Sequence, residues 1–297
     1  MGKVVVVGSV HADRLLRVHE LPVPGQTVLA HGHARAPGGK GANQAVAAAR
    51  LGATTAFIGQ VGDDVDGTEL RASLTAEGID VSGVLVHPSL ATGLAIVTVD
   101  DHGENVIIVS SGASGALTAS AVRQQAAALG GADVTLVQLE VPLAAVEAAV
   151  DAGGGLLILN PAPAAELPAS LLDHVDVLVP NRVELAGLVD DPTGLGSLTE
   201  VSLAAQALSH RCHVVVTLGA EGVLLVDGDH ATHIPAPTVD VVDTTGAGDA
   251  LCGALAACLA DGMPLERAVR RSVRVAAFST TRPGAQTAEP TPTDTDP

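Results

Sequence analysis

A short glycine-rich turn followed by an aspartate is the first stretch of this sequence that could do chemistry. Gly246, Ala247 and Gly248 precede Asp249, and a small, apolar, helix-forming run follows. A tight loop that opens into a helix points several backbone N–H groups at one spot, where the helix dipole also favours an anion such as a phosphate. The carboxylate of Asp249 therefore either caps the helix or acts beside a bound anion.

A second glycine-rich turn, residues 38–43, precedes an alanine-rich helix. It is not a Walker loop, because Gly41 and not Ser or Thr follows Lys40, and the first turn lacks the third glycine of a Rossmann fingerprint. One such turn is weak evidence for a site. Two of them, both with polar side chains such as Lys40 and Asn43, suggest two halves of one binding site.

Strands and helices that alternate along the chain must position these turns. Val4–Val7 is a continuous β-branched run, typical of a strand buried on both faces. Further strands are predicted at 54–58, 134–137, 156–159, 177–179 and 214–217, with a late hairpin at 223–234. The alternation predicts an α/β fold, with a mostly parallel central sheet and helices on both faces. Ligands bind such sheets at the carboxyl ends of the strands, where the predicted loop 8–13 begins.

Two insertions, at about 14–35 and 92–109, are predicted to form a small β-sheet lid. Strands are expected at 27–33, 94–99 and 105–109, and we expect the last two to pair with the first. His31 and His33 share a face of the first strand, and we interpret them as lid surface because no third metal ligand can be named. One domain is predicted over 1–286, followed by a disordered, Thr/Pro/Asp-rich tail at 287–297.

The composition excludes several classes of function. The net charge is −18, with no Trp, no Tyr and two Phe, which argues against binding of nucleic acid by phosphate contacts or base stacking. The three cysteines show neither zinc-ligand nor disulfide spacing, and no apolar run is long enough to span a membrane. We therefore expect a cytoplasmic protein that acts on small molecules and contacts neither nucleic acid nor membrane.

Two segments, GGKGANQAVAAARLG at 38–52 and DTTGAGDALCG at 243–253, resemble the signatures of the PfkB family of sugar and nucleoside kinases. The resemblance covers residues 3 to about 290 and is strongest to the ribokinase branch. Supporting segments occur in family order: Gly8-Ser9 with Asp13, residues 59–64, 138–140, 160–163, 181–184, 217–222 and 281–286. The resemblance implies a ribokinase-like fold and ATP-dependent phosphorylation of D-ribose at O5.

The resemblance also implies roles for individual residues. Asp249 would be the general base, and the N–H groups of Gly246, Ala247 and Gly248 would form an anion hole. The implied sugar-binding residues are His11, Asp13, Gly39, Lys40, Asn43, Glu140 and Asp249. Asn43 could instead cap a helix, Lys40 could be a solvated loop charge, and Glu140 a surface charge at a strand end.

The nucleotide and its ions have implied sites as well. Asn181 and Glu184 would organise Mg²⁺ and phosphate, although they could be an ordinary exposed helix pair. The residues implied to line ATP are Thr217, Leu218, Gly219, Ala220, Glu221, Gly222 and Gly248. A K⁺ site built mainly from backbone carbonyls is implied at Asp243, Thr245, Ser279, Arg282 and Gly284.

Three positions depart from the family pattern: His11 where Asn is usual, Val273 near the expected adenine position, and Ala288 near the expected cation site. We expect His11 to tune the choice of sugar, with Asp13 favouring its charged form.

The alternatives to a ribose kinase are a PfkB kinase for another sugar or a nucleoside, and a catalytically silent sugar-binding protein. The lid region has no aromatic residue for a nucleobase, which favours a small sugar. Its exposed edges suggest a homodimer that pairs through the lid.

Overall fold

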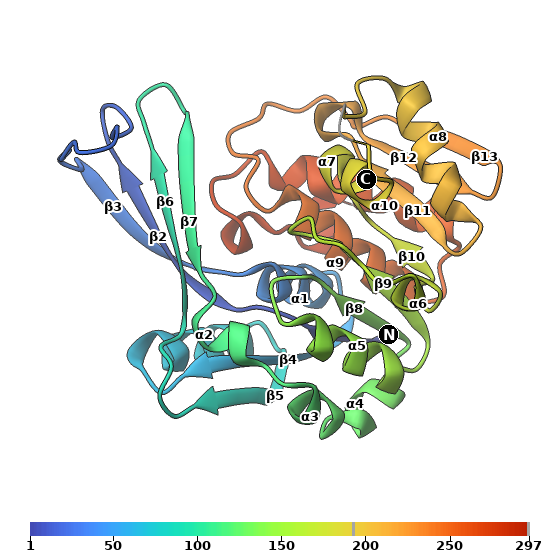
Figure 1. The fold of residues 1–297 in the computed structure, drawn as a ribbon, viewed down its shortest axis with the longest axis horizontal. Helices are drawn as coiled ribbons and strands as arrows, with labels where there is room; N and C mark the ends of the chain where they lie inside the picture. Colours follow the sequence, from blue (N-terminus) through green and yellow to red (C-terminus); the bar gives the residue numbers. More distant parts are fainter. Residues whose placement is uncertain (192–193, 296–297) are drawn as a thin grey trace.

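The computed structural model describes residues 1–191 and 194–295, and within them nine strands form the central sheet (Figure 1). The strands are β1 (Lys3–Val7), β4 (Thr54–Gly62), β5 (Asp80–His87), β8 (Val134–Val137), β9 (Leu156–Leu159), β10 (Val177–Leu178), β11 (His213–Thr217), β12 (Val223–Asp227) and β13 (His230–Ile234). Their order is β13-β12-β11-β10-β9-β8-β1-β4-β5, and those from β11 to β5 run parallel. The predicted α/β fold with a mostly parallel sheet is confirmed. β5 had not been predicted.

The central strand β1 shows why the sheet is covered on both faces. Its four valines are fully buried between β4 and β8. Because successive side chains of a strand point to opposite faces, Val4 and Val6 enter one hydrophobic core while Val5 and Val7 enter the other. A strand with two apolar faces needs helices on both sides.

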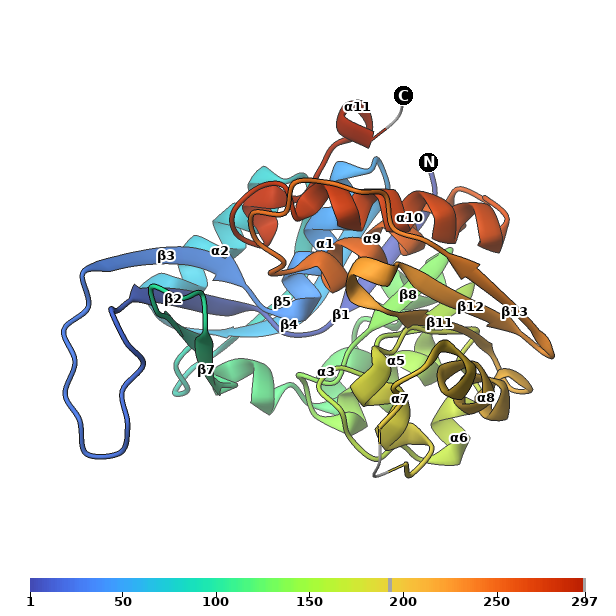
Figure 2. The same cartoon turned by 90° about the horizontal axis from the view of Figure 1, so that it is seen from above.

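The helices form a layer on each face of the sheet (Figure 2). One layer contains α1 (Lys40–Arg50), α2 (Val65–Ala76), α9 (Ala247–Ala260) and α10 (Leu265–Ser279). The other contains α3 (Ala119–Arg123), α4 (Ala126–Gly130), α5 (Leu143–Ala152), α6 (Ala169–Leu172), α7 (Arg182–Leu188) and α8 (Leu198–Ser209). The two helices that follow the glycine-rich turns, α1 and α9, lie side by side in the first layer. Among the described residues, no helix is both long and apolar enough to cross a membrane.

Four strands form a separate sheet, which is the predicted lid (Figure 1). They are β2 (His11–Arg17), β3 (Gly32–Gly38), β6 (Gly93–Val99) and β7 (Asn105–Ser110), in the order β3-β2-β6-β7. The expected loop at 8–13 is wrong from residue 11 onward, because β2 begins there, and the strand expected at 27–33 lies instead at 32–38. β6 pairs with β2 and not with the predicted first strand. Short-range pattern does not reveal which strand is central, because that depends on long-range pairing.

Ion pairs tie the base of the lid to the main domain. The Arg14 guanidinium on β2 donates to both carboxylate oxygens of Asp66 on α2, at 2.8 and 2.7 Å. Arg35 on β3 donates to the same carboxylate. This shared contact sets where the lid leaves the main domain.

The expected disorder from residue 287 is wrong for the segment that follows α10. Gln286–Ala288 form a 3₁₀ turn, Pro292–Thr295 form α11, and the Ala288 and Glu289 side chains are buried. Arg50 at the end of α1 donates to the carbonyl oxygens of Gln286 and Glu289, at 2.7 and 2.8 Å. Composition alone predicts disorder here, but this distant arginine supplies the backbone partners. Residues 296–297 of the predicted tail lie outside the described residues.

Candidate active site

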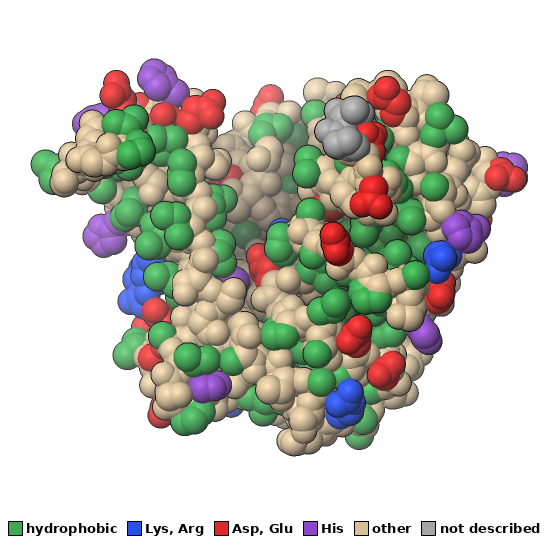
Figure 3. Space-filling view, viewed as in Figure 1, with side chains coloured by type: hydrophobic (Ala, Val, Ile, Leu, Met, Phe, Trp, Pro, Cys, Tyr) green, Lys and Arg blue, Asp and Glu red, His purple; other side chains and the backbone are tan. Residues whose placement is uncertain are grey.

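A pocket of about 140 Å³ lies where α9 begins, beside the carboxyl ends of central strands. Figure 3 shows the surface hollowed between the lid and the main domain. Residues implied by the resemblance that line the pocket are Lys40, Asn181, Glu184, Thr217, Gly246, Ala247, Gly248 and Asp249. Residues that the sequence analysis did not name as site residues also line it: Asn160, Ala162, Val179, Thr244 and Cys252.

Asp249 is buried at the start of α9 and does not cap the helix. The N-cap is Gly246, in the left-handed conformation, and it makes no side-chain capping bond. The Asp249 carboxylate instead accepts hydrogen bonds from Asn43 Nδ2 and Gln44 Nε2, both at 2.9 Å. The capping alternative is therefore wrong, and two amides from α1 hold the carboxylate at the pocket wall.

A chain of buried amides supports this contact. Gln44 also donates to Asn160 Oδ1 at 3.1 Å and accepts from Gln138 Nε2 at 2.6 Å. Asn43 accepts from Gln286 Nε2 at 3.0 Å, so Asn43 does not cap a helix either. Gln44 is a site residue that was not predicted, although Lys40, Asn43 and Gln44 share a helix face by their spacing.

The electrostatics of the pocket are dominated by Asp249 and the half-buried Lys40. Burial raises the pKa of Asp249, while the Lys40 charge and the two amide hydrogen bonds partly oppose the rise. Burial alone would lower the pKa of Lys40, but Asp249, Glu140 and Glu184 outweigh it and raise that pKa. Lys40 thus stays charged among carboxylates and is not a free loop charge.

Glu140 joins the segment before β2 to the glycine-rich turn at 38–43. Its Oε2 accepts from Ser9 Oγ at 2.5 Å and from the backbone N–H of Lys40 at 3.0 Å. The Glu140 charge also acts on Asp13, whose pKa rises to about 7 through burial first, then through Glu140 and Asp249, against an opposing effect of Arg14. Glu140 is therefore not a surface charge at a strand end.

Asp13 and His11 point from β2 and are less well satisfied than Asp249. Gly38, paired with His11 across β2 and β3, leaves the space that the Asp13 carboxylate fills, since a Cβ at residue 38 would collide with it. Among the described residues, Asp13 Oδ1 and His11 Nε2 have no hydrogen-bond partner although both atoms are buried. Unpaired buried polar atoms are costly, and a bound polar ligand would satisfy them.

The expectation for the charge of His11 is wrong. Burial lowers the pKa of His11, and the charge that opposes this effect is that of Glu140 rather than Asp13. His11 is 2% exposed, and this burial favours the neutral form of its imidazole. Neutral imidazole offers one donor and one acceptor, as the amide of Asn does.

Asn181 and Glu184 form a capping box at the start of α7. Asn181 Oδ1 accepts from the Glu184 N–H and Glu184 Oε2 accepts from the Asn181 N–H, both at 2.8 Å. Burial raises the pKa of Glu184, against the effects of the Asn181 hydrogen bond and the Lys40 charge. The pair is therefore structural and also borders the pocket, rather than an ordinary exposed helix pair.

The segment 217–222 contributes less side-chain surface to this pocket than expected. Thr217 lines it, whereas Leu218 is buried in the core under α8 and Glu221 forms an ion pair with Arg182. The remaining members of the segment, Gly219, Ala220 and Gly222, are not among the lining residues.

The first turn of α9 presents backbone N–H groups to the pocket. Gly246 has φ 79°, and a Cβ there would meet Ala285 at 2.8 Å, so both conformation and space require glycine. The first intrahelical hydrogen bond runs from Ala250 to Gly246, which leaves the N–H groups of Gly248 and Asp249 ahead of it. The Ala247 N–H differs from expectation, since it donates to the Thr244 carbonyl at 3.2 Å.

Asp243 joins the two segments in which the K⁺ site was implied. Its carboxylate accepts from the Thr245 N–H at 2.9 Å and the Gly284 N–H at 2.8 Å. The other two implied residues direct their side chains elsewhere: Ser279 Oγ donates to Ala276 within α10, and Arg282 contacts Asp294 and the Phe278 ring. The side chains of Ser279 and Arg282 are thus engaged within the chain, and the Ser279 carbonyl accepts the Arg282 N–H at 3.3 Å.

Comparisons with known proteins agree over nearly the whole chain. The family model described as pfkB family carbohydrate kinase matches residues 1–292. The ribokinase of Haemophilus influenzae is 37% identical over 297 residues, covering 98% of this chain and 96% of that protein. A deoxyribokinase of Salmonella typhi is 34% identical over 293 residues, covering 97% and 95%.

Solved structures match with the same extent. The crystal structure of ribokinase from Thermotoga maritima has a TM-score of 0.91 and 34% identity, covering 100% of this chain and 98% of that one. The structure of Arabidopsis thaliana ribokinase complexed with ribose and ATP has a TM-score of 0.87 and 30% identity, covering 99% and 97%.

Proposed function

The chain belongs to the pfkB family of carbohydrate kinases, and from this premise we propose that it phosphorylates D-ribose at O5 with ATP. The observation that carries the proposal is the buried Asp249 carboxylate, held by Asn43 and Gln44 at the N-terminus of α9. A base and an anion-binding helix end lie in one pocket, as transfer of a phosphoryl group to a hydroxyl requires.

Asp249 acts as the general base in this proposal. Its raised pKa makes the carboxylate a stronger proton acceptor than an exposed aspartate, while the two amides and Lys40 favour its charged form. The carboxylate takes the proton from the attacking sugar hydroxyl. The N–H groups of Gly248 and Asp249, together with Lys40, stabilise negative charge on the transferred group.

The sugar lies against β2 and the start of α1. The unpaired atoms of His11 and Asp13 would bond its hydroxyls, and Lys40, Asn43, Glu140 and the backbone of Gly39 complete the contacts. Asn43 already gives one N–H to Asp249, so it orients the base and binds the sugar with its second N–H. The lid, formed by β2, β3, β6 and β7, excludes water above the bound sugar.

The nucleotide is proposed to bind at the α9 end of the pocket. A relative of known structure is described as complexed with ribose and ATP, and the pocket lining here combines Thr217 with the α9 N-terminus. The oxygen atoms of Asn181 and Glu184 fit Mg²⁺, which prefers hard oxygen ligands and retains several waters. When bound, ATP with Mg²⁺ supplies the phosphoryl group and neutralises its charge.

A monovalent cation site is proposed beside α9. Asp243 links the residues around Thr245 to the segment that includes Gly284, so both backbones are within reach of one ion. K⁺ should raise the rate at fixed Mg²⁺ and ionic strength. A rate that is unchanged when a bulky organic cation replaces K⁺ would remove this site from the proposal.

The chain is also proposed to form a homodimer through the lid and to act in the cytoplasm. The three cysteines are buried and form no disulfide among the described residues, as in a reducing compartment. The lid edge strand β7 leaves its apolar side chains exposed, and a second lid could cover them.

The test is a phosphorylation screen over pentoses, hexoses and nucleosides with the purified chain. D-ribose is expected to give the highest kcat/KM, with 2-deoxy-D-ribose as the most informative competitor because it lacks one hydroxyl. Similarity to a deoxyribokinase and the departure at His11 make that comparison necessary. Preferred turnover of 2-deoxyribose would change the substrate, and preferred turnover of a nucleoside would reject the sugar proposal. No turnover with any acceptor would favour a silent binding protein.

A further inference from the structure

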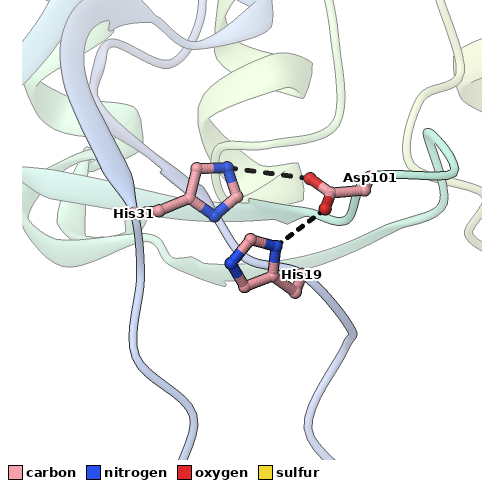
Figure 4. Close-up of side chains that lie close together, drawn as sticks. All are labelled: His19, His31 and Asp101. Atoms are coloured by element: carbon pink, nitrogen blue, oxygen red, sulfur yellow. Dashed lines mark hydrogen bonds and ion pairs between the residues drawn. The ribbon is translucent and has the colours of Figure 1, made fainter.

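Two histidines and an aspartate meet on the lid, and none of them lines the Asp249 pocket (Figure 4). His19 and His31 lie at the two ends of the loop between β2 and β3, and Asp101 lies in the turn between β6 and β7. Asp101 Oδ2 is 2.8 Å from His19 Nδ1, and Asp101 Oδ1 is 3.7 Å from His31 Nε2. Two loops of the lid therefore meet at one carboxylate.

The geometry of the three side chains suits a small metal ion. One donor atom from each residue lies within 4.8 Å of the other two. A tetrahedral Zn²⁺ site with bonds of about 2.0–2.2 Å places neighbouring donor atoms roughly 3.3 Å apart. His19 Nδ1 lies 2.8 Å from Asp101 Oδ2 and His31 Nε2 lies 3.7 Å from Asp101 Oδ1, so each imidazole is near this spacing from one oxygen of the same carboxylate. Small side-chain rotations would bring the donors to bonding distance.

The chemistry of the set also favours a cation over a purely hydrogen-bonded cluster. The two imidazole rings stack with centroids 4.6 Å apart and both turn a nitrogen toward Asp101. One divalent ion between the rings could bond a nitrogen of each and an oxygen of the carboxylate at once. Imidazole and carboxylate together are ordinary Zn²⁺ ligands. Two further acidic residues of the same turn, Asp100 and Glu104, add attraction for a cation.

We propose that His19, His31 and Asp101 bind a divalent first-row transition metal ion, with Zn²⁺ as the reference ion and water as the fourth ligand. The side chains are 78%, 40% and 52% exposed, so water reaches the ion and the site is open. An open site of three exposed ligands binds more weakly than a closed structural zinc site.

A metal ion at the proposed site would cross-link two loops of the lid. Residues 18–31 carry no strand or helix, and their ends are already joined by the His31 N–H bond to the Arg17 carbonyl at 2.9 Å. A metal bound to His19 and His31 would close this loop at its base, and Asp101 would attach it to the β6–β7 turn. Closing a loop in this way removes conformational entropy from the open state.

The experiment is a Zn²⁺ titration of the untagged chain, which is first treated with a chelator. Isothermal titration calorimetry in buffer that contains Mg²⁺ measures the binding. The wild type is expected to bind one Zn²⁺ per chain. His19→Ala and Asp101→Asn should each weaken binding by at least about tenfold, the smallest change usual when a zinc site is disturbed. His102→Ala is the matched control, because His102 is an exposed histidine of the same turn but not one of the three donors.

A second readout is limited proteolysis within residues 18–31. Zn²⁺ should slow cleavage of this loop in the wild type and in His102→Ala, but not in His19→Ala. All three substitutions are at exposed residues, so circular dichroism is expected to show an unchanged fold. The proposal is overturned if the wild type does not bind Zn²⁺. It is equally overturned if His19→Ala and Asp101→Asn bind the ion as tightly as the control.

Discussion

The Asp249 pocket and the lid use polar and apolar side chains in opposite ways. Around Asp249, buried amides of Asn43, Gln44 and Asn160 are hydrogen-bonded to partners within the chain. On β7 of the lid, four apolar side chains from Val106 to Val109 are 48–63% exposed. The polar side chains of the pocket are thus held by contacts within the chain. The apolar side chains of β7, in contrast, are not covered by any of the described residues.

This difference separates the Asp249 pocket, whose geometry needs only the single chain, from the outer strand of the lid, which is open to a partner. The Asp249 carboxylate, which we propose as the proton acceptor, is positioned by the packing of α1 against α9 without a ligand or partner, so turnover should be sensitive to isosteric changes there. The lid is held mainly at its base, through the Arg14 and Arg35 contacts to Asp66, and its outer strand is open to pairing. Substitutions on β7 should therefore act on association before they act on chemistry.

The largest expected effect is that of Asp249→Asn on turnover. Asn keeps the shape of the side chain but cannot accept the proton, so kcat should fall by about 10²–10⁴-fold. Steady-state kinetics with ribose and ATP measure the loss, and thermal unfolding checks that the fold remains. Asp261→Asn, at the exposed far end of the same helix, is the control and should leave kcat unchanged. Near-normal turnover in a folded Asp249→Asn protein would contradict the assignment of the base.

The next largest expected effect is that of Ile108→Asp, on the exposed face of β7, on dimer formation. If β7 pairs with a second lid, a charge there becomes buried without a partner, and the dimer dissociation constant should rise about tenfold or more. Analytical ultracentrifugation measures the change. Leu203→Asp on α8 is a matched control, because Leu203 is 64% exposed and Ile108 is 63% exposed. A monomeric wild type, or equal effects of both substitutions, would show that β7 is not the interface.

A smaller effect concerns the pH dependence of sugar use. The pKa of Asp13 is about 7 in the free protein, and the proposal requires its carboxylate to accept a sugar hydroxyl. Protonation should then lower kcat/KM for ribose as pH falls below about 7, because kcat/KM reports groups of the free enzyme. Burial also raises the pKa of Asp249, so loss of the base contributes to the fall in the same direction.

Asp13→Asn separates these two contributions. The variant should have a higher KM and should lose the part of the acid limb near pH 7, while the fall caused by Asp249 remains. Glu104→Gln, which changes an exposed lid carboxylate, is the control and should retain the wild-type profile. Superimposable profiles for Asp13→Asn and the wild type would show that Asp13 does not set the limb.

The smallest expected effect concerns a buried carboxyl group that, unlike Asp249, accepts no hydrogen bond from the described residues. Glu289 is 2% exposed, and neither carboxyl oxygen has a hydrogen-bond partner among the described residues. Burial raises its pKa well above the ordinary value, with a further rise from the Asp249 charge. The folded protein therefore keeps the Glu289 proton at pH values where the unfolded chain has released it. The free energy of unfolding consequently falls as pH rises from the ordinary glutamate pKa of the unfolded chain to the raised pKa of the folded protein.

Glu289→Gln removes this titration. The variant should unfold at a higher temperature than the wild type at pH 8, by the equivalent of about 1–3 kcal/mol, and the difference should shrink at pH 5. Thermal unfolding at the two pH values measures it, with the exposed Glu166→Gln as control. A difference that is the same at both pH values would mean that the buried carboxyl does not titrate with folding.

Much of the fold could be predicted because strand and helix periodicity is a local property. Val4–Val7 reads as a doubly buried strand from its own four side chains, and the two glycine-rich turns precede helices as predicted. The lid and the strands at 94–99 and 105–109 were predicted to within one residue, but β2, the bounds of β3 and the pairing of β6 with β2 were not, because β2 carries polar residues that hide its pattern. The ordered segment after α10 was missed for a similar reason, since Arg50 lies far away in the sequence.

The amino-acid sequence alone determined the two glycine-rich turns and the alternation of most strands and helices along the chain, because these depend on residues within a few positions of one another. Tertiary structure decided that Asp249 binds amides instead of capping α9. The hydrogen bond from Asn43 to Asp249 joins residues 206 positions apart, and it exists because α1 packs beside α9. The meeting of His19 with Asp101 likewise needs two lid loops to be brought together by strand pairing. Spacing cannot reveal such contacts, since the free energy that forms them comes from packing of whole elements.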